Sequence, residues 1–297
     1  MNGVIVIDKP AGVTSARVVA TVKRCLKGVK VGHTGTLDPA ATGVLVCTVG
    51  AATRLSRFFL AAPKTYRATC RLGVETDTQD AEGQITARRP VTVDEARVRT
   101  ATARFQGAIT QVPPVFSALK HRGVPLYRLA RAGRAVAKPS RRVTVYRLTV
   151  LAVDLPQVML EVACSAGTYV RTLCADLGTA LGCGGHMNAL RRTACAGFTL
   201  ADAVSLETLE TLARQGRIAE RIIDMNAALR QMAEVTAPPA LARRIANGGR
   251  LGAADIPPPA GEEALKVVDH RQRLLAVVTF DPDTRHYDYV CVMPHQP

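Results

Sequence analysis

Apolar positions in this chain of 297 residues fall into short runs and into helical spacings, so both strands and helices are predicted. The runs predict strands at 3–9, 43–49, 64–73, 142–153 and 157–164, the last two paired with each other. Helical spacing, capping residues and glycine stops predict helices at 16–26, 55–60, 93–105, 174–182 and 202–230. A mixed fold of strands and helices is therefore expected.

The last sixty residues carry a pattern of their own. Pro238 and Pro239 follow the preceding helical region and resemble a linker. A short helix at 241–247 comes next, and the apolar runs 265–269 and 274–278 flank a polar turn, which predicts a hairpin. The boundary is expected at the linker, giving a large domain at 1–236 and a small β module at 237–297.

Residues 32–45, GHTGTLDPAATGVL, place Asp38 in a glycine-rich loop before a buried strand. Three glycines in so short a stretch require a backbone that turns tightly or lies close to another group. Pro39 biases Asp38 toward an extended or turn conformation, so its carboxylate is presented beside a sheet, where it could take part in chemistry. An aspartate before proline is more often a turn former that bonds nearby amides. The loop pattern by itself leaves both interpretations open.

Positive charge is concentrated in the first half of the chain. The net charge is +15, yet residues 1–150 hold 25 Lys and Arg against 8 Asp and Glu, whereas residues 151–297 hold 14 against 16. Residues 96–153 contain 12 basic residues and no acidic one. This asymmetry indicates a polyanionic partner that contacts the first half. A basic face that is merely solvated would give the same counts.

Several classes of protein do not fit the sequence. No apolar run approaches the roughly 20 residues of a membrane span, so no membrane partner is expected. No Walker A motif is present and no GxGxxG follows a strand, so no nucleotide cofactor is expected. The eight cysteines contain no CxxC pair, and with no signal peptide they indicate reduced thiols in a cytoplasmic protein. No histidines and cysteines stand at ligand spacing, so no metal is expected.

Several ordered motifs resemble the TruB family of pseudouridine synthases, which modify tRNA at position 55. In the stretch 32–45, every fixed position of the family's catalytic motif GHTGxLDPxATGVL is present. The other matching stretches, as they stand here, are DKPAGVTS at 8–15, KTYR at 64–67, QVPPVFSALK at 111–120, SAGTYVRTL at 165–173 and LRR at 190–192. The resemblance covers nearly the whole chain.

The resemblance implies three catalytic residues. Asp38 would be the nucleophile, attacking C1′ or C6 of the target nucleotide. Arg171 would pair with it, and a neighbouring guanidinium would lower the pKa of the carboxylate and keep it ionised. Tyr66 would stack on the uracil and help remove the C5 proton. From residue type alone, Arg171 is more often a structural salt bridge and Tyr66 a cross-strand packing residue.

The resemblance also implies the residues that bind the substrate. Besides Tyr66, Tyr169 and Leu190 would complete the uracil pocket, although a leucine is by default a core residue. His33 would assist in flipping the nucleotide out of its stack, a step that chemistry on a base requires. Basic residues within the acid-free region would lie in an arm that contacts the RNA backbone. They are Lys120, Arg122, Arg128, Arg131, Arg141 and Arg142.

The fold class implied is α/β (α+β): a catalytic domain with a mixed, mainly antiparallel sheet flanked by helices, followed by a PUA-like RNA-binding β module. The implied activity is isomerisation of the uridine at position 55 in the T-loop of tRNA to pseudouridine. This reaction is redox-neutral, so no cofactor is expected. The T-arm of tRNA would be the partner of a monomeric enzyme.

Two other functions remain open on the sequence. A non-catalytic tRNA-binding or tRNA-folding chaperone would use the same basic face, but it has no need of the set Asp38, Tyr66, Tyr169 and Arg171. A metal-dependent hydrolase could use Asp38 with Asp77 and Asp80, but histidine ligands are lacking.

Overall fold

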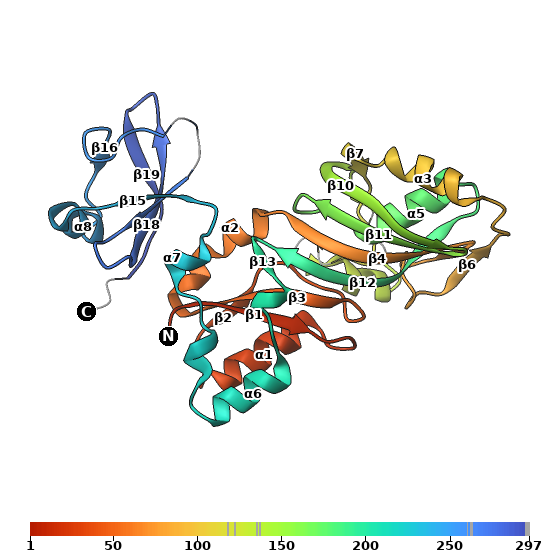
Figure 1. Cartoon of the computed structure of the whole chain (residues 1–297), viewed down its shortest axis with the longest axis horizontal. Helices are drawn as coiled ribbons and strands as arrows, with labels where there is room; N and C mark the ends of the chain where they lie inside the picture. The colour runs from red at the N-terminus through yellow and green to blue at the C-terminus, as the bar shows by residue number, and fades with distance from the viewer. Residues whose placement is uncertain are drawn as a thin grey trace.

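The computed structural model describes residues 1–294 except 118, 122, 135, 137, 260, 262 and 263, and the side chains at 120, 121, 125, 127 and 131 are also left out. Ten strands of the described residues form one large sheet (Figure 1). They are β1 (Gly3–Lys9), β2 (Val31–His33), β3 (Thr42–Val49), β4 (Lys64–Leu72), β7 (Gly107–Gln111), β10 (Arg141–Asp154), β11 (Gln157–Cys164), β12 (Gly185–Cys195), β13 (Phe198–Thr199) and β14 (Val204–Ser205).

The strand order is β14-β1-β3-β12-β4-β11-β10-β7, with β13 beside β12 and β2 beside β3. Only the pairs β1–β14 and β3–β12 are parallel among the described ladders of this sheet. The expected mixed, mainly antiparallel sheet is thus confirmed. The predicted pairing of the strands at 142–153 and 157–164 is also confirmed, as β10 and β11.

The central strand β12 is one that the apolar pattern does not predict. Its sequence, GHMNALRRTAC, has two consecutive arginines where a buried strand would have apolar residues. Pairing with β4 on one side and β3 on the other holds it in the middle of the sheet. The register places Leu190 opposite Ala68 and Arg192 opposite Tyr66, so that β12 and β4 bring side chains to one site.

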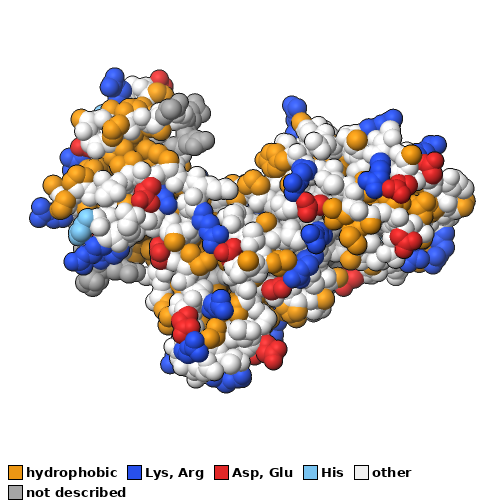
Figure 2. Space-filling view, in the orientation of Figure 1, with side chains coloured by type: hydrophobic (Ala, Val, Ile, Leu, Met, Phe, Trp, Pro, Cys, Tyr) orange, Lys and Arg blue, Asp and Glu red, His pale blue; other side chains and the backbone are white. Residues whose placement is uncertain are grey.

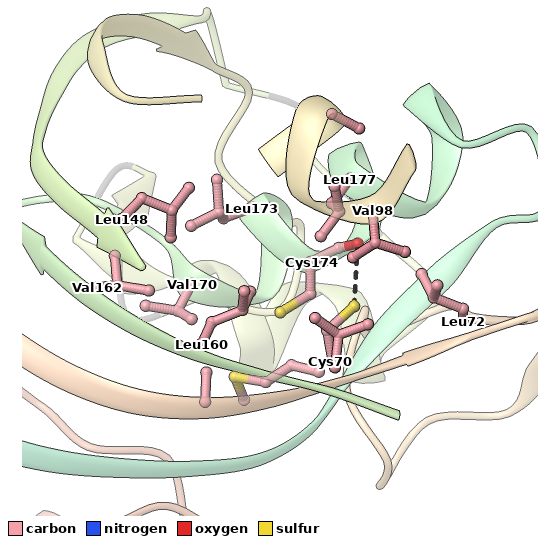
Figure 3. Packing of buried hydrophobic residues seen from close by; sticks show 14 of the residues in the cluster. Cys70, Leu72, Val98, Leu148, Leu160, Val162, Val170, Leu173, Cys174 and Leu177 are labelled. Atoms are coloured by element: carbon pink, nitrogen blue, oxygen red, sulfur yellow. Dashed lines mark hydrogen bonds between the residues drawn. The ribbon is translucent and has the colours of Figure 1, made fainter. Parts of the chain in front are cut away.

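Two helices cover the face of the sheet formed by β4, β11 and β10. They are α3 (Glu95–Ala103) and α5 (Val170–Ala180), and their apolar side chains pack against the strands (Figure 3). Leu160 and Leu173 are among the fully buried side chains of this core. Each such side chain contributes roughly 1.5–3 kcal/mol of transfer free energy. The core therefore fixes the position of α5, which begins at the candidate site.

The helix predicted at 93–105 begins two residues later, at Glu95. Asp94 is the N-cap, because its carboxylate accepts a hydrogen bond from Arg97 N at 2.8 Å.

A second pair of helices, α1 (Ser15–Cys25) and α6 (Leu206–Arg214), packs against β1 and β3 (Figure 1). Next to β3, a 3₁₀ turn η1 (Gly50–Leu55) leads into α2 (Ser56–Ala61).

The prediction of a continuous helical region at 202–230 was wrong. The structure has instead η2 (Leu200–Asp202), β14, α6, η3 (Ile218–Arg221) and α7 (Met225–Ala228). The Ser205 hydroxyl starts α6 anew by accepting from Thr208 N, and Gly216, at φ 73°, follows its end. Separate capping signals therefore divide a stretch whose composition favours helix.

Two small hairpins project from the large sheet. The first pairs β5 (Val74–Thr76) with β6 (Ile85–Arg88). The second pairs β8 (Lys120–His121) with β9 (Val124–Pro125), and α4 (Leu126–Arg131) follows it. The second hairpin and α4 belong to residues 112–140, here called the arm, which connect β7 to β10.

Five strands of the described residues form a C-terminal sheet in the order β15-β17-β18-β19-β16 (Figure 1). They are β15 (Ala233–Thr236), β16 (Leu251–Gly252), β17 (Leu265–Val268), β18 (Leu274–Asp281) and β19 (His286–Val292), with helix α8 (Pro239–Ala246) beside them. The predicted hairpin is thus present as β17 and β18. The expected boundary between residues 236 and 237 needs correction, because β15 pairs in parallel with β17 and so belongs to this sheet.

The two sheets share a hydrophobic cluster. Val4 and Val46 of the large sheet lie in the same buried cluster as Val268, Leu274 and Val277 of the C-terminal sheet. The C-terminal sheet therefore also contributes apolar packing to the domain before it. No helix within the described residues is long and apolar enough to cross a membrane.

Candidate active site

A pocket of about 320 Å³ lies where the Asp38 loop, β4, β12 and the start of α5 meet. Five of the predicted catalytic and uracil-binding residues line it. They are Asp38 from the loop between β2 and β3, Tyr66 from β4, Tyr169 and Arg171 from the start of α5, and Leu190 from β12. The structure thus brings together side chains that are up to 152 residues apart in the sequence, from Asp38 to Leu190.

The Arg171 guanidinium lies between two carboxylates. Its Nε is 3.2 Å from Asp38 Oδ2, and its Nη1 is 3.2 Å from Asp80 Oδ2. The Arg171 side chain is 6% exposed, that of Asp80 13% and that of Asp38 39%. Asp80, which the sequence suggested only as a ligand in a metal-dependent hydrolase, instead pairs with Arg171 and helps to orient it.

The pKa of Asp38 differs from the sequence-based expectation. Burial is the largest effect and raises the pKa of this carboxyl, and the charge of Asp80 raises it further. Arg171 and Lys9 act in the opposite direction but do not outweigh the loss of water. The expected effect of Arg171, which lowers the pKa of Asp38 and favours the ionised form, is therefore present, but burial outweighs it and the net shift is upward.

Two buried residues hold the Asp38 loop from the N-terminal strand and helix. Lys9 donates from Nζ to Pro39 O at 3.0 Å and to the carbonyls of Pro10 and Val13, and burial lowers its pKa to about 8. Ser15 Oγ donates to Leu37 O at 3.0 Å and accepts from Leu37 N at 2.9 Å. The main chain on both sides of Asp38 is thereby fixed.

Two buried cations complete the wall of the pocket. Arg192 donates to Val44 O at 2.6 Å and to Gly35 O at 3.1 Å, so it ties both ends of the loop to β12. A side chain at Gly43 would lie 2.1 Å from the Arg192 carbonyl, which explains why glycine follows Thr42 in the loop motif. Lys64 donates to Leu60 O and Ala62 O, each at 2.6 Å. The sequence signal for Arg192 and Lys64 was present in the LRR and KTYR motifs.

Tyr66 lines the pocket, in an environment that disfavours ionisation of its phenol. Burial raises the pKa of its phenol to about 12, so the hydroxyl is neutral at pH 7. A neutral phenol is a poor proton acceptor, which favours the stacking role of Tyr66 over its role as a base. Arg192 next to it lowers this pKa but does not outweigh burial.

His33 ends β2 and is not among the residues that line the pocket. Its side chain is half-buried, and its Nδ1 is buried with no hydrogen-bond partner in the described part of the chain. Burial and the nearby Arg192 lower its pKa, so the imidazole is neutral. Any role of His33 in flipping the nucleotide would therefore be outside the pocket.

The predicted RNA-contacting residues divide into three groups. Arg128 and Arg142 are exposed. Arg141 instead lines the pocket, with its guanidinium 4.8 Å from the centre of the Tyr169 ring and donating to Gly167 O. Arg122 lies outside the described residues, as do the side chains of Lys120 and Arg131. On the face shown in Figure 2, Lys and Arg side chains are spread over both sheets.

The carboxylates proposed for a hydrolase do not form a metal site. Asp80 pairs with Arg171, whereas Asp77 accepts a hydrogen bond from Gln84 N at 2.8 Å. The residues that the structure describes contain no group of three or more His, Cys, Asp or Glu able to hold a metal ion. A guanidinium between Asp38 and Asp80 occupies the place that a cation would need.

Comparison with protein families gives two adjoining matches. Residues 23–170 match the model described as TruB family pseudouridylate synthase (N terminal domain). Residues 171–233 match the model of the tRNA pseudouridylate synthase B C-terminal domain. The second match ends at the first residue of β15, so together the two matches cover most of the large sheet.

Individual proteins similar to this chain include two curated bacterial relatives. The tRNA pseudouridine synthase B of Burkholderia mallei (strain NCTC 10247) is 46% identical over 280 residues, which are 93% of this chain and 92% of the relative. The protein of the same name from Ralstonia pickettii (strain 12J) is 48% identical over 255 residues, 84% of this chain and 80% of the relative.

Two solved structures are similar in fold. One is a crystal structure of a Cbf5-Nop10-Gar1 complex, in which the matched chain has a TM-score of 0.77 and 27% identity and the match covers 98% of this chain and 85% of that one. The other is an H/ACA RNP bound to a substrate RNA containing 2′-deoxyuridine, with a TM-score of 0.74, 25% identity and coverage of 99% and 84%.

Proposed function

Because the chain belongs to the TruB family of pseudouridylate synthases, enzymes that isomerise uridine in tRNA, we propose that its target is the uridine at position 55 of the T-loop. The observation that carries the proposal is the Asp38–Arg171–Asp80 arrangement at the base of a pocket lined by Tyr66 and Leu190. A pocket of about 320 Å³ accommodates a single base, which must leave its stack to enter.

Asp38 is the proposed nucleophile. The reaction breaks the bond from ribose C1′ to uracil N1, turns the base, and joins C1′ to C5. The C5 proton then leaves and N1 gains a proton, so no electrons are exchanged with a cofactor. Arg171 holds the Asp38 carboxylate in place at 3.2 Å and favours its ionised form. Attack at C1′ and attack at C6 both use the same carboxylate.

The proposed partner is the T-arm stem-loop, bound by a monomer. Arg128 of the arm and Arg142 of β10 are exposed, and phosphate contacts of such arginines supply affinity without sequence preference. The C-terminal sheet is proposed to be a PUA-like RNA-binding module. From Pro238 to Pro297 it has seven Lys and Arg and seven Asp and Glu, so it would add contacts that depend on shape.

A non-catalytic tRNA chaperone is the weaker alternative. Folding RNA requires a basic surface but not an ion-paired carboxylate inside a pocket. Burying the pair costs desolvation free energy that binding alone would not return. The placement of Arg171 between Asp38 and Asp80 therefore favours the enzyme.

The deciding experiment uses an unmodified tRNA transcript and the purified protein without added cofactor. Pseudouridine mapped at position 55, and absent from a transcript with cytidine at that position, would support the proposal. Modification confined to another uridine would overturn the choice of position while leaving the family activity intact. The same assay in EDTA, with a spermidine-folded tRNA, separates a metal needed for chemistry from one needed by the RNA.

The pH dependence of the reaction follows from the raised pKa of Asp38. Only the carboxylate form can attack, so the rate falls as the pH is lowered through the pKa of Asp38. Because that pKa is raised, the loss begins at a higher pH than for an ordinary aspartate, whose pKa is about 3.9. Single-turnover rates measured across the acid range, with tRNA binding followed in parallel, test this. A rate that stays constant down to the pH at which binding is lost would contradict it.

Arg128 of the arm and Arg142 of β10 are expected to act through phosphate contacts. Replacing Arg128 and Arg142 with alanine should weaken binding to all tRNAs alike, and each lost contact should reduce the slope of log affinity against log salt by roughly 0.7–0.9. Arg217, which pairs with Glu220 on η3, offers a control substitution outside the arm. An unchanged slope in the Arg128→Ala/Arg142→Ala protein would show that this face is only solvated.

A further inference from the structure

The arm leaves the large sheet and returns to it at a single pair of residues. Gln111 is the last residue of β7, and Arg141 is the first residue of β10. The two are directly opposite each other in the antiparallel ladder. Residues 112–140 therefore start and end at one cross-strand pair.

Both ends of the Gln111 carboxamide form hydrogen bonds with the main chain of Tyr169. Its Nε2 donates to Tyr169 O at 3.2 Å, and its Oε1 accepts from Tyr169 N at 3.0 Å. Gln111 is 1% exposed, so its carboxamide is itself shielded from water. Two bonds to one residue fix both the position and the rotation of that peptide segment.

Two more contacts connect the arm with the same segment. Arg141 stacks on the Tyr169 ring and donates to Gly167 O. Within the arm, Phe116 O accepts a hydrogen bond from Arg171 Nη2 at 2.8 Å. The start of the arm and the start of β10 thus hold the stretch 167–171 through its main chain, its aromatic ring and its guanidinium.

We propose that Gln111 is a positioning residue for the reaction. Together with Arg141, it fixes the stretch 167–171 to the base of the arm. The arm, which holds the RNA, and the Arg171–Asp38 pair then share one rigid support. The inference builds on the proposed function, since it assumes that the arm contacts RNA and that Asp38 attacks. Gln111 itself touches neither the pocket nor the substrate.

Loss of the Gln111 carboxamide is expected to affect the position of Arg171 in particular. Without the carboxamide, the Tyr169 N–H loses its partner, and the Tyr169 C=O keeps the hydrogen bond from Leu173 N at 3.1 Å, so the segment is held less firmly. Arg171 would then sit less well against Asp38, and a displacement of about 1 Å from productive geometry costs up to roughly a hundredfold in rate. Because Arg171 opposes the effect of burial on Asp38, the acid limb of the rate profile should also move to higher pH.

The test compares Gln111→Met with Gln106→Met in the full-length protein. Gln106 Oε1 accepts from Leu148 N at 3.3 Å, so it is also a glutamine bonded to the main chain of β10, but it lies away from the pocket. Gln111→Met is expected to lower the single-turnover rate at saturating tRNA about tenfold or more, to leave the Kd for tRNA within about twofold, and to shift the acid limb upward. Gln106→Met should match the wild type in all three.

A second variant, Gln111→Asn, keeps the carboxamide but withdraws it by one methylene, and it covers the case in which Gln111→Met fails to fold. It should show a smaller loss in rate and a smaller shift of the acid limb, in the same direction. A wild-type rate and pH profile in a folded Gln111 variant, or a loss confined to the Kd, would overturn the inference. If the wild type modifies a uridine other than position 55, the proposed target fails, while the same rate comparison at the observed uridine still tests Gln111.

Discussion

Replacing Asp38 with asparagine should abolish pseudouridine formation and leave the affinity for tRNA within about twofold. Asparagine preserves the size and most hydrogen bonding of the side chain, but its amide is not a nucleophile. The loop that carries it is held through Lys9, Ser15 and Arg192, none of which bonds to the carboxylate itself. Geometry should therefore survive the substitution, and the loss should be in the rate constant of chemistry.

The measurement is the single-turnover rate with tRNA in the presence of excess protein, together with the Kd of the same preparation. Asp77→Asn serves as the control, because Asp77 is an exposed aspartate in a loop that accepts a main-chain hydrogen bond and does not line the pocket. Multiple turnovers by a pure Asp38→Asn protein would remove Asp38 as the nucleophile. A large loss of affinity would indicate that the carboxylate acts in binding.

The strands and helices that the sequence predicted well are those with a strong local signal. β10 and β11 alternate along their length and were predicted within one residue, as was α1. β12 was missed because its position depends on its two neighbours rather than on its own apolar pattern. The prediction of a continuous helix at 202–230 was wrong for the opposite reason, since the composition of this region favours helix but local caps interrupt it.

The candidate site was predictable where a motif carried it. Asp38, Tyr66, Tyr169, Arg171 and Leu190 were named from their motifs, and the structure places all five around one pocket. Their mutual distances could not be derived from the sequence, because they come from different strands and loops. His33 shows the limit of such inference, since it shares the motif of Asp38 yet is not among the residues that line the pocket.

The residues that the sequence did not assign are mostly those that position others. Asp80 lies in a polar loop and meets Arg171 only through the bridge of that loop to β12 at Met187. Ser15 bonds to Leu37 in the Asp38 loop, a contact that its place next to the helix cap Thr14 does not predict. The sign of the Asp38 pKa shift was missed for a related reason, because burial is a property of the assembled pocket.

Removal of the Arg171 guanidinium is expected to have the second largest effect. In Arg171→Met, Asp38 and Asp80 lose the cation that lies 3.2 Å from each, and Asp80 is left as a buried charge. Breaking a buried pair in this way typically costs about 3–5 kcal/mol, a range that the partial exposure of Asp38 reduces toward its lower end. The rate should fall at least about a hundredfold, and the acid limb should move to higher pH because Asp38 is harder to ionise.

A second substitution separates the structural role of Arg171 from its catalytic one. Adding Asp80→Asn to Arg171→Met removes the unpaired buried charge, so the free energy of unfolding, measured in urea, should recover in part. The rate should not recover, since Asp38 still lacks the guanidinium that holds it and favours its charge. If the rate instead returns together with stability, Arg171 is a structural salt bridge, and the carboxylate of Asp38 acts without help from a neighbouring cation.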